Sequence, residues 1–146
     1  MIGAEILKPL AVLAGWTMVM WIWMYVTRIP AMNKAGIDSK NLVGGSGKDL
    51  DAVIDPKVQW IAHNYNHLHE APTVFYAVAL ALALIGQGDG LNAELAWVYV
   101  VLRVLHSLVQ ATSNRVLIRF ALFALSSLAL MALALHLLLA VFHSPA

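Results

Sequence analysis

The dominant pattern along the chain is one of long apolar runs separated by short polar segments. Residues 9–26 and residues 120–142 contain no Asp, Glu, Lys or Arg. A helix rises about 1.5 Å per residue, so about 20 apolar residues cross the roughly 30 Å hydrocarbon core of a bilayer. The two runs therefore predict membrane-spanning helices at about residues 3–27 and 115–142.

Two apolar runs between these helices predict two more spans. Residues 71–86 are too few to cross a bilayer alone, and they suffice only if their helix begins further back, near Lys57. Three glycines within residues 86–90 then mark a tight turn. Residues 93–112 form the next predicted helix.

Composition agrees with a membrane protein. Hydrophobic residues make up 61% of the 146-residue chain and charged residues only 12%. Soluble helix bundles show one apolar stripe on each helix, whereas these segments are apolar almost all round. The sequence thus predicts an all-α membrane protein, a four-transmembrane-helix bundle that forms one domain over residues 1–146. Its helices are expected at about 3–27, 57–86, 93–112 and 115–142, with a hydrophilic loop at 28–56.

Basic residues gather at two of the connections. Seven of the nine Lys and Arg residues lie in the first connection or at the turn between the third and fourth spans. They are Arg28, Lys34, Lys40, Lys48, Lys57, Arg115 and Arg119. Basic loops stay on the cytoplasmic side of a membrane, so both termini are expected on the non-cytoplasmic side. The net charge of +1, without a clustered basic face, predicts no nucleic-acid partner.

Polar side chains within the predicted spans follow the helical repeat. Four residues of the second span recur at i, i+3, i+4 and i+7 and so share one helix face. They are His63, Asn66, His67 and Glu70. On the third span Arg103, His106 and Gln110 repeat the pattern, and Arg119 opens the fourth. An ionisable group inside a span costs about 2.5–3.5 kcal/mol on insertion scales, so such groups tend to face the bundle interior and mark function.

Glu70 and Arg103 lie at depths that differ by less than about two helical turns. A buried carboxylate requires a cation. We therefore expect Arg103, or Arg119 from the same or an adjacent subunit, to approach Glu70 directly or through water. The plainer alternative for the whole set is polar contact between helices with no further role.

These residues could form either of two kinds of binding site. In the first, the imidazoles of the second span, Glu70 and His106 supply the nitrogen and oxygen ligands of a metal. In the second, the arginines and imidazoles hold a small carboxylate-bearing molecule while Glu70 accepts its ammonium group. Arg103 and Arg119 would repel a divalent cation, so the charge balance favours the second chemistry.

Two segments carry a family pattern, HNYNHLHEAPTVFYA and WVYVVLRVLHSLVQATSNRVLIRFALF. Their Glu-x-Pro at Glu70 and Pro72 and Arg-x-x-His at Arg103 and His106 resemble the bacterial branch of the MAPEG family, the membrane-associated proteins in eicosanoid and glutathione metabolism. The resemblance covers nearly the whole chain. It implies trimers of four-helix subunits, here in a bacterial inner membrane. It also implies glutathione between adjacent subunits, with its thiol turned to a lipid-accessible cleft.

The resemblance also implies roles for single residues. Arg119 is similar to the arginine that stabilises the glutathione thiolate, and it is the predicted catalytic residue. The predicted glutathione-binding residues are Arg28, His63, Asn66, His67, Glu70, Arg103, His106 and Gln110. The chain departs from the family pattern where His63 replaces an arginine, His67 replaces an asparagine and Gln110 replaces a common tyrosine.

These features favour a glutathione-dependent transferase or peroxidase acting on lipophilic electrophiles from the membrane. The altered pocket and the apolar exterior support an alternative, a non-catalytic accessory or scaffold subunit of a larger membrane complex. A metal or haem site on the histidines is a third hypothesis. The expected partners are membrane lipid and either two further copies in a homotrimer or a larger assembly. Small residues of the second span permit close approach between subunits; they are Ala77, Ala79, Ala81 and Ala83.

Overall fold

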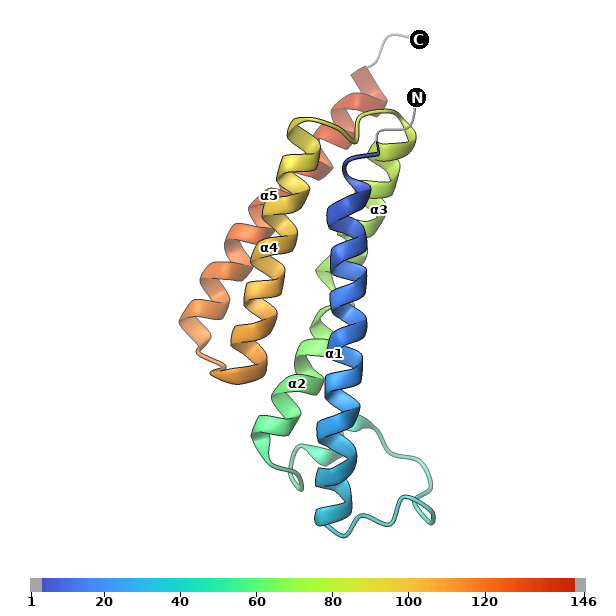
Figure 1. Ribbon diagram of the computed structural model, residues 1–146, viewed down its shortest axis with the longest axis vertical. Helices are drawn as coiled ribbons and strands as arrows, with labels where there is room; N and C mark the ends of the chain where they lie inside the picture. Colours follow the sequence, from blue (N-terminus) through green and yellow to red (C-terminus); the bar gives the residue numbers. More distant parts are fainter. Residues whose placement is uncertain (1–3, 144–146) are drawn as a thin grey trace.

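The computed structural model describes residues 4–143, whose regular structure is helical (Figure 1). The helices are α1 (Leu7–Lys34), α2 (Pro56–His67), α3 (Ala71–Leu84), α4 (Leu91–Thr112) and α5 (Val116–His143), with a short 3₁₀ helix, Gly47–Leu50, in the long connection. Together α2 and α3 form the segment Pro56–Leu84, which makes four segments long and apolar enough to cross a membrane. The predicted all-α, four-span membrane fold is confirmed.

Helix α1 continues past the predicted end at residue 27. Its predicted start at residue 3 lies outside the described residues, and the helix begins at Leu7. It ends at Lys34 because Gly36 adopts a left-handed conformation (φ +70°), which a residue without Cβ takes at little cost. The amide of Ile37 then donates to the Met32 carbonyl at 3.1 Å, the bond that closes a Schellman motif. The end of the apolar run therefore does not end the helix.

A correction concerns residues 57–86, which were predicted as one continuous helix and are divided into α2 and α3. Pro72 lies in the first turn of α3. In an unbroken helix it would offer no N–H to the Leu68 carbonyl, and its ring would collide with that group. Glu70 accordingly leaves the helical conformation (φ −94°, ψ −106°). The Glu70 side chain is 67% exposed.

The two ends of the bundle bring different segments together. The amide of Ile6 donates to the Gly88 carbonyl at 2.9 Å. His136, on the C-terminal half of α5, contacts Asn92 in the first turn of α4 at 2.6 Å. The start of α1, the turn between α3 and α4 and the end of α5 thus share one end, while the long connection and the α4–α5 turn lie toward the other (Figure 1).

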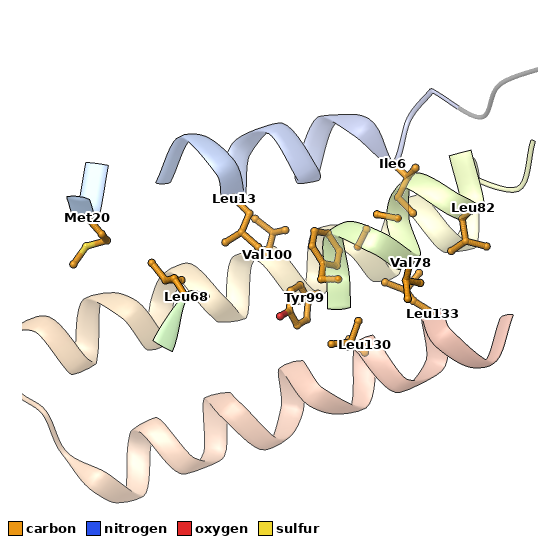
Figure 2. Packing of buried hydrophobic residues seen from close by; sticks show 14 of the residues in the cluster. Ile6, Leu13, Met20, Leu68, Val78, Leu82, Tyr99, Val100, Leu130 and Leu133 are labelled. Carbon is orange, nitrogen blue, oxygen red and sulfur yellow. The ribbon is translucent and has the colours of Figure 1, made fainter. Parts of the chain in front are cut away.

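An apolar core runs between the helices. Phe75 of α3 stacks on Tyr99 of α4 with ring centroids 4.5 Å apart, and Leu13, Leu82 and Leu133 are fully buried (Figure 2). Many other large apolar side chains point outward from α1, α4 and α5. Lipid tails are as apolar as these side chains, so close packing and polar contacts between helices, rather than exclusion from water, must hold the bundle together.

Candidate functional site

A polar cavity of about 280 Å³ lies between α2, α4 and α5, beside the α4–α5 turn. Its walls are His67, His106, Gln110, Val116, Arg119, Phe120 and Phe123. The four polar residues of this set all belong to the sequence-predicted site. The three apolar ones all come from the first turns of α5, which the sequence pattern did not single out.

Arg119 reaches the cavity because of the turn that precedes α5. Helix α4 ends at Thr112, and Asn114, two residues later, adopts a left-handed conformation (φ +49°) that asparagine tolerates. The Asn114 side-chain oxygen then accepts a hydrogen bond from Arg119 Nη1. Arg119 Nε is buried and has no partner among the described residues. The guanidinium is thus held in place by one bond, with donor capacity left for another group.

His67 connects an exposed carboxylate to a buried guanidinium. Its Nε2 lies 3.2 Å from Arg103 Nη1, and its Nδ1 lies 2.6 Å from Glu70 Oε2. Arginine can only donate, so Nε2 accepts and the proton of the neutral imidazole sits on Nδ1, where it is donated to the carboxylate. The expected direct contact of Glu70 with Arg103 is therefore replaced, within this chain, by a contact through His67.

Arg103 is the largest polar side chain in the interior, with 1% of its surface exposed. Its Nε donates to the Tyr99 hydroxyl at 3.3 Å. The guanidinium carbon lies 5.2 Å from the centroid of the Phe123 ring and 5.6 Å from that of Tyr99, within range of cation–π attraction. Nη2 has no partner among the described residues. The positive charge therefore lies directly behind the cavity wall formed by His67 and Phe123.

Asn64 joins three helices through a buried hydrogen-bond network. It is fully buried on α2, and its Nδ2 donates to Gln110 Oε1 at 2.9 Å. Its Oδ1 accepts from the hydroxyl of Ser107, whose oxygen accepts from Trp16 Nε1 at 2.9 Å. Gln110 therefore makes a structural hydrogen bond with Asn64 and also lines the cavity.

Asn66, not Asn64, was the predicted site residue, and the structure leaves Asn66 exposed. A signal was present in the sequence. Asn64 stands three residues after Ile61 and four before Leu68, both buried apolar residues, so it occupies the core face of α2. On α2 the register with the apolar positions was therefore the better guide to burial, whereas on α4 the predicted polar stripe of Arg103, His106 and Gln110 is itself buried.

Arg28 and His63, both predicted to bind glutathione, lie outside the cavity and hold the long connection. Arg28 Nη2 donates to Gln59 Oε1 at 3.1 Å and to the Gly47 carbonyl at 3.3 Å. Gln59 Nε2 donates to Asp51 Oδ1 at 2.6 Å, and His63 Nε2 lies 3.1 Å from the same oxygen. These contacts tie the 3₁₀ segment to α1 and α2.

The histidines do not gather as a metal site would require. Within residues 4–143 no three His, Cys, Asp or Glu side chains converge. The rings of His67 and His106 lie close, with centroids 5.1 Å apart, but His63 turns to Asp51. The cavity instead combines a guanidinium with apolar walls, which suits an anionic or thiolate-bearing molecule attached to an apolar group.

A protein-family model, that of the MAPEG family, matches residues 6–139. The chain belongs to the MAPEG family. No curated protein sequence and no solved structure matches it. The MAPEG resemblance of the two motif segments is thereby confirmed. The reaction of this MAPEG protein must be argued from its own site, because one fold can carry several functions.

The buried network of this MAPEG protein gives a first testable prediction. Asn64→Leu leaves Ser107 and Gln110 without their partner, and we expect a loss of about 1–2 kcal/mol in the free energy of unfolding. Denaturant unfolding in detergent measures it. Asn66→Leu makes the same change on the exposed side of α2 and should stay within about 0.5 kcal/mol of wild type. Equal losses in both variants would contradict the network.

The role of His67 gives a second prediction. Glu70→Gln and Arg103→Met should show non-additive effects on stability, with a coupling of about 0.5–2 kcal/mol. The coupling should vanish in a His67→Leu background, since the imidazole is the link between the two charges. His67→Gln, which keeps a donor and an acceptor, should preserve part of it. Coupling that persists with leucine would show that the charges interact by another route.

Proposed function

We propose that this MAPEG protein is a glutathione-dependent transferase or peroxidase that acts on lipophilic electrophiles. The observation that carries the proposal is the Arg119 guanidinium, half-buried in a partly apolar cavity, with one buried N–H that has no partner among residues 4–143. A fixed cation in such a place stabilises a thiolate relative to its thiol, because it opposes the developing negative charge. Bound glutathione would supply the nucleophilic sulfur. In the transferase reaction the sulfur bonds to an electrophilic carbon as a leaving group departs. In the peroxidase reaction it attacks a peroxide oxygen, the O–O bond breaks to release an alcohol, and a second glutathione converts the resulting sulfenic acid to glutathione disulfide and water.

The remaining walls have complementary roles in this proposal. Val116, Phe120 and Phe123 line the cavity with apolar surface where the electrophile would lie beside the sulfur. His106 and Gln110 would orient glutathione. The positive charge of Arg103, which lies behind His67, would attract the carboxylates of glutathione. Holding both reactants in one place converts a bimolecular encounter into a reaction within a complex.

We propose further that the working unit is a homotrimer in which adjacent subunits complete the site. A cavity of about 280 Å³ lies just below the usual range for small-molecule sites, roughly 300–1,000 Å³. Three of the predicted binding residues lie exposed on the same chain, where a neighbouring subunit's ligand could meet them: His63, Asn66 and Glu70. A site shared between subunits would account for both observations.

The location of the cavity agrees with a bacterial inner membrane protein whose termini are outside the cytoplasm. Arg115 and Arg119 lie at the α4–α5 turn, at the end of the bundle that also carries the basic long connection. Positive connections stay in the cytoplasm. The cavity would therefore open near the cytoplasmic surface.

A second candidate function, an accessory or scaffold subunit without catalysis, is favoured by one observation. Several residues predicted to bind glutathione are already bonded within the chain: Gln110 to Asn64, His63 to Asp51 and Arg28 to Gln59. Polar residues that are hydrogen-bonded to one another within the chain stabilise it whether or not a ligand binds.

The catalytic proposal predicts thiolate formation at neutral pH. Glutathione added to the purified protein should develop the ultraviolet absorbance of a bound thiolate, and Arg119→Met should abolish it and lower turnover by about 10²-fold or more. Arg115→Met, one turn earlier and exposed, is the matched control and should behave as wild type. A folded protein that binds no glutathione at millimolar concentration would refute the proposal and leave the scaffold role.

The trimer proposal predicts a complex of three chains by native mass spectrometry in mild detergent. The predicted row of small residues on α3 is only partly free, because Ala79 and Ala83 are buried within the chain. Ala77 is exposed, so Ala77→Phe should weaken the trimer if α3 faces a neighbour. Leu128→Phe, at an exposed position of α5, is the control. A wild-type monomer under these conditions would contradict the prediction.

A further inference from the structure

A second cavity lies at the opposite end of the bundle from Arg119. It has a volume of about 520 Å³ and is formed by the turn between α3 and α4, the first turn of α4 and the C-terminal part of α5. Its lining residues are Gln87, Asp89, Leu91, Asn92, His136, Leu139 and Ala140. None of these residues touches the candidate glutathione cavity, so they have no part in the proposed reaction.

Hydrogen bonds around His136 determine what this cavity offers a ligand. Asn92 Nδ2 donates to the Gln87 carbonyl at 2.7 Å. Its amide oxygen therefore faces His136 Nδ1, 2.6 Å away, and accepts a hydrogen bond from it. In the neutral imidazole the other nitrogen, Nε2, then carries a lone pair and can only accept. His136 thus presents a hydrogen-bond acceptor rather than a donor.

Asp89 adds negative charge to the same cavity. Its Oδ1 accepts the backbone N–H of Glu5 at 3.0 Å, which uses one of the roughly four lone-pair positions of a carboxylate. Lys8, three residues after Glu5, is paired with the Glu5 side chain at 2.7 Å. The cavity accordingly combines an acceptor nitrogen with a carboxylate that has capacity for a cationic donor.

The surroundings of the cavity are apolar. Leu91 and Leu139 line it and are themselves 60% and 46% exposed. Along α5 the exposed surface continues through Leu135, Leu138 and Phe142. A ligand that binds here would have its polar group among Asp89 and His136 and its remainder against aliphatic side chains, at the end of the bundle where α1 begins and α5 ends (Figure 1). A soluble amine would leave that apolar surface uncovered.

We propose that this cavity binds the headgroup of a phospholipid that carries a primary ammonium group, such as phosphatidylethanolamine. The ammonium donates to the Asp89 carboxylate and to His136 Nε2, and the acyl chains lie along α5. A primary ammonium has three N–H donors, whereas the trimethylated ammonium of phosphatidylcholine has none. Electrostatic attraction to Asp89 alone would not distinguish the two lipids. The hydrogen-bond acceptors Asp89 and His136 Nε2 favour the lipid whose ammonium group has N–H donors.

The test is native mass spectrometry of the full chain in mild detergent, titrated separately with phosphatidylethanolamine, phosphatidylcholine and soluble phosphoethanolamine. Phosphatidylethanolamine should bind about tenfold more tightly than phosphatidylcholine, the change expected for losing hydrogen bonds to charged groups. Asp89→Asn and His136→Leu should each remove most of this preference. His136→Gln, which keeps an acceptor, should retain part of it, and His143→Leu, outside the cavity, should leave it unchanged.

Three outcomes would overturn the proposal. Equal binding of the two lipids would show that only the apolar surface is recognised. Tight binding of phosphoethanolamine would show that the ligand is a soluble amine. A preference that survives both Asp89→Asn and His136→Leu would place the selective site elsewhere. The thiolate absorbance with glutathione, measured on the same variants, should be unchanged, so the result is independent of the proposed reaction.

Discussion

The buried guanidinium of Arg103 is the constraint around which the other interactions of the bundle are arranged. A charged group among membrane helices must have its donors met by neighbours, because neither water nor lipid tails can do so. Tyr99 provides one acceptor on the same helix, His67 provides a second from α2, and Phe123 covers the planar face from α5. The stacking of Phe75 on Tyr99 extends this group to α3. The group centred on Arg103 therefore joins residues of four helices.

The break between α2 and α3 makes this arrangement feasible. Pro72 ends the helical path at Leu68–Glu70, and Glu70 at the surface can then accept a hydrogen bond from His67 Nδ1. The imidazole thus lies between a cation and an anion. Glu70 thereby balances the charge of Arg103 without touching it. The guanidinium still contributes a positive potential at the cavity wall.

The two ends of the bundle carry opposite chemistry. Near the α4–α5 turn, Arg119 and His67 surround a cavity that offers donors and positive charge. At the other end, Asp89 and His136 surround a cavity that offers acceptors and negative charge. We propose that the protein binds an anionic thiol at one end and an aminolipid at the other, and α4 and α5 form part of both cavities.

The sequence by itself determined the number of spans, their approximate bounds and the family, because apolar run length and local motifs do not depend on the packing of one helix against another. It also identified His67, His106, Gln110 and Arg119, which line the cavity. Only the tertiary structure decided that Asn64 rather than Asn66 is buried, that Arg28 and His63 hold the long connection, and that Glu70 reaches Arg103 through His67. The burial of Asn64 depends on the rotation of α2 about its own axis. The contacts of Arg28 and His63 depend on the path of the long connection, and the position of Glu70 depends on the break at Pro72. Helical spacing shows which residues share a face, but packing against neighbouring helices decides where that face points.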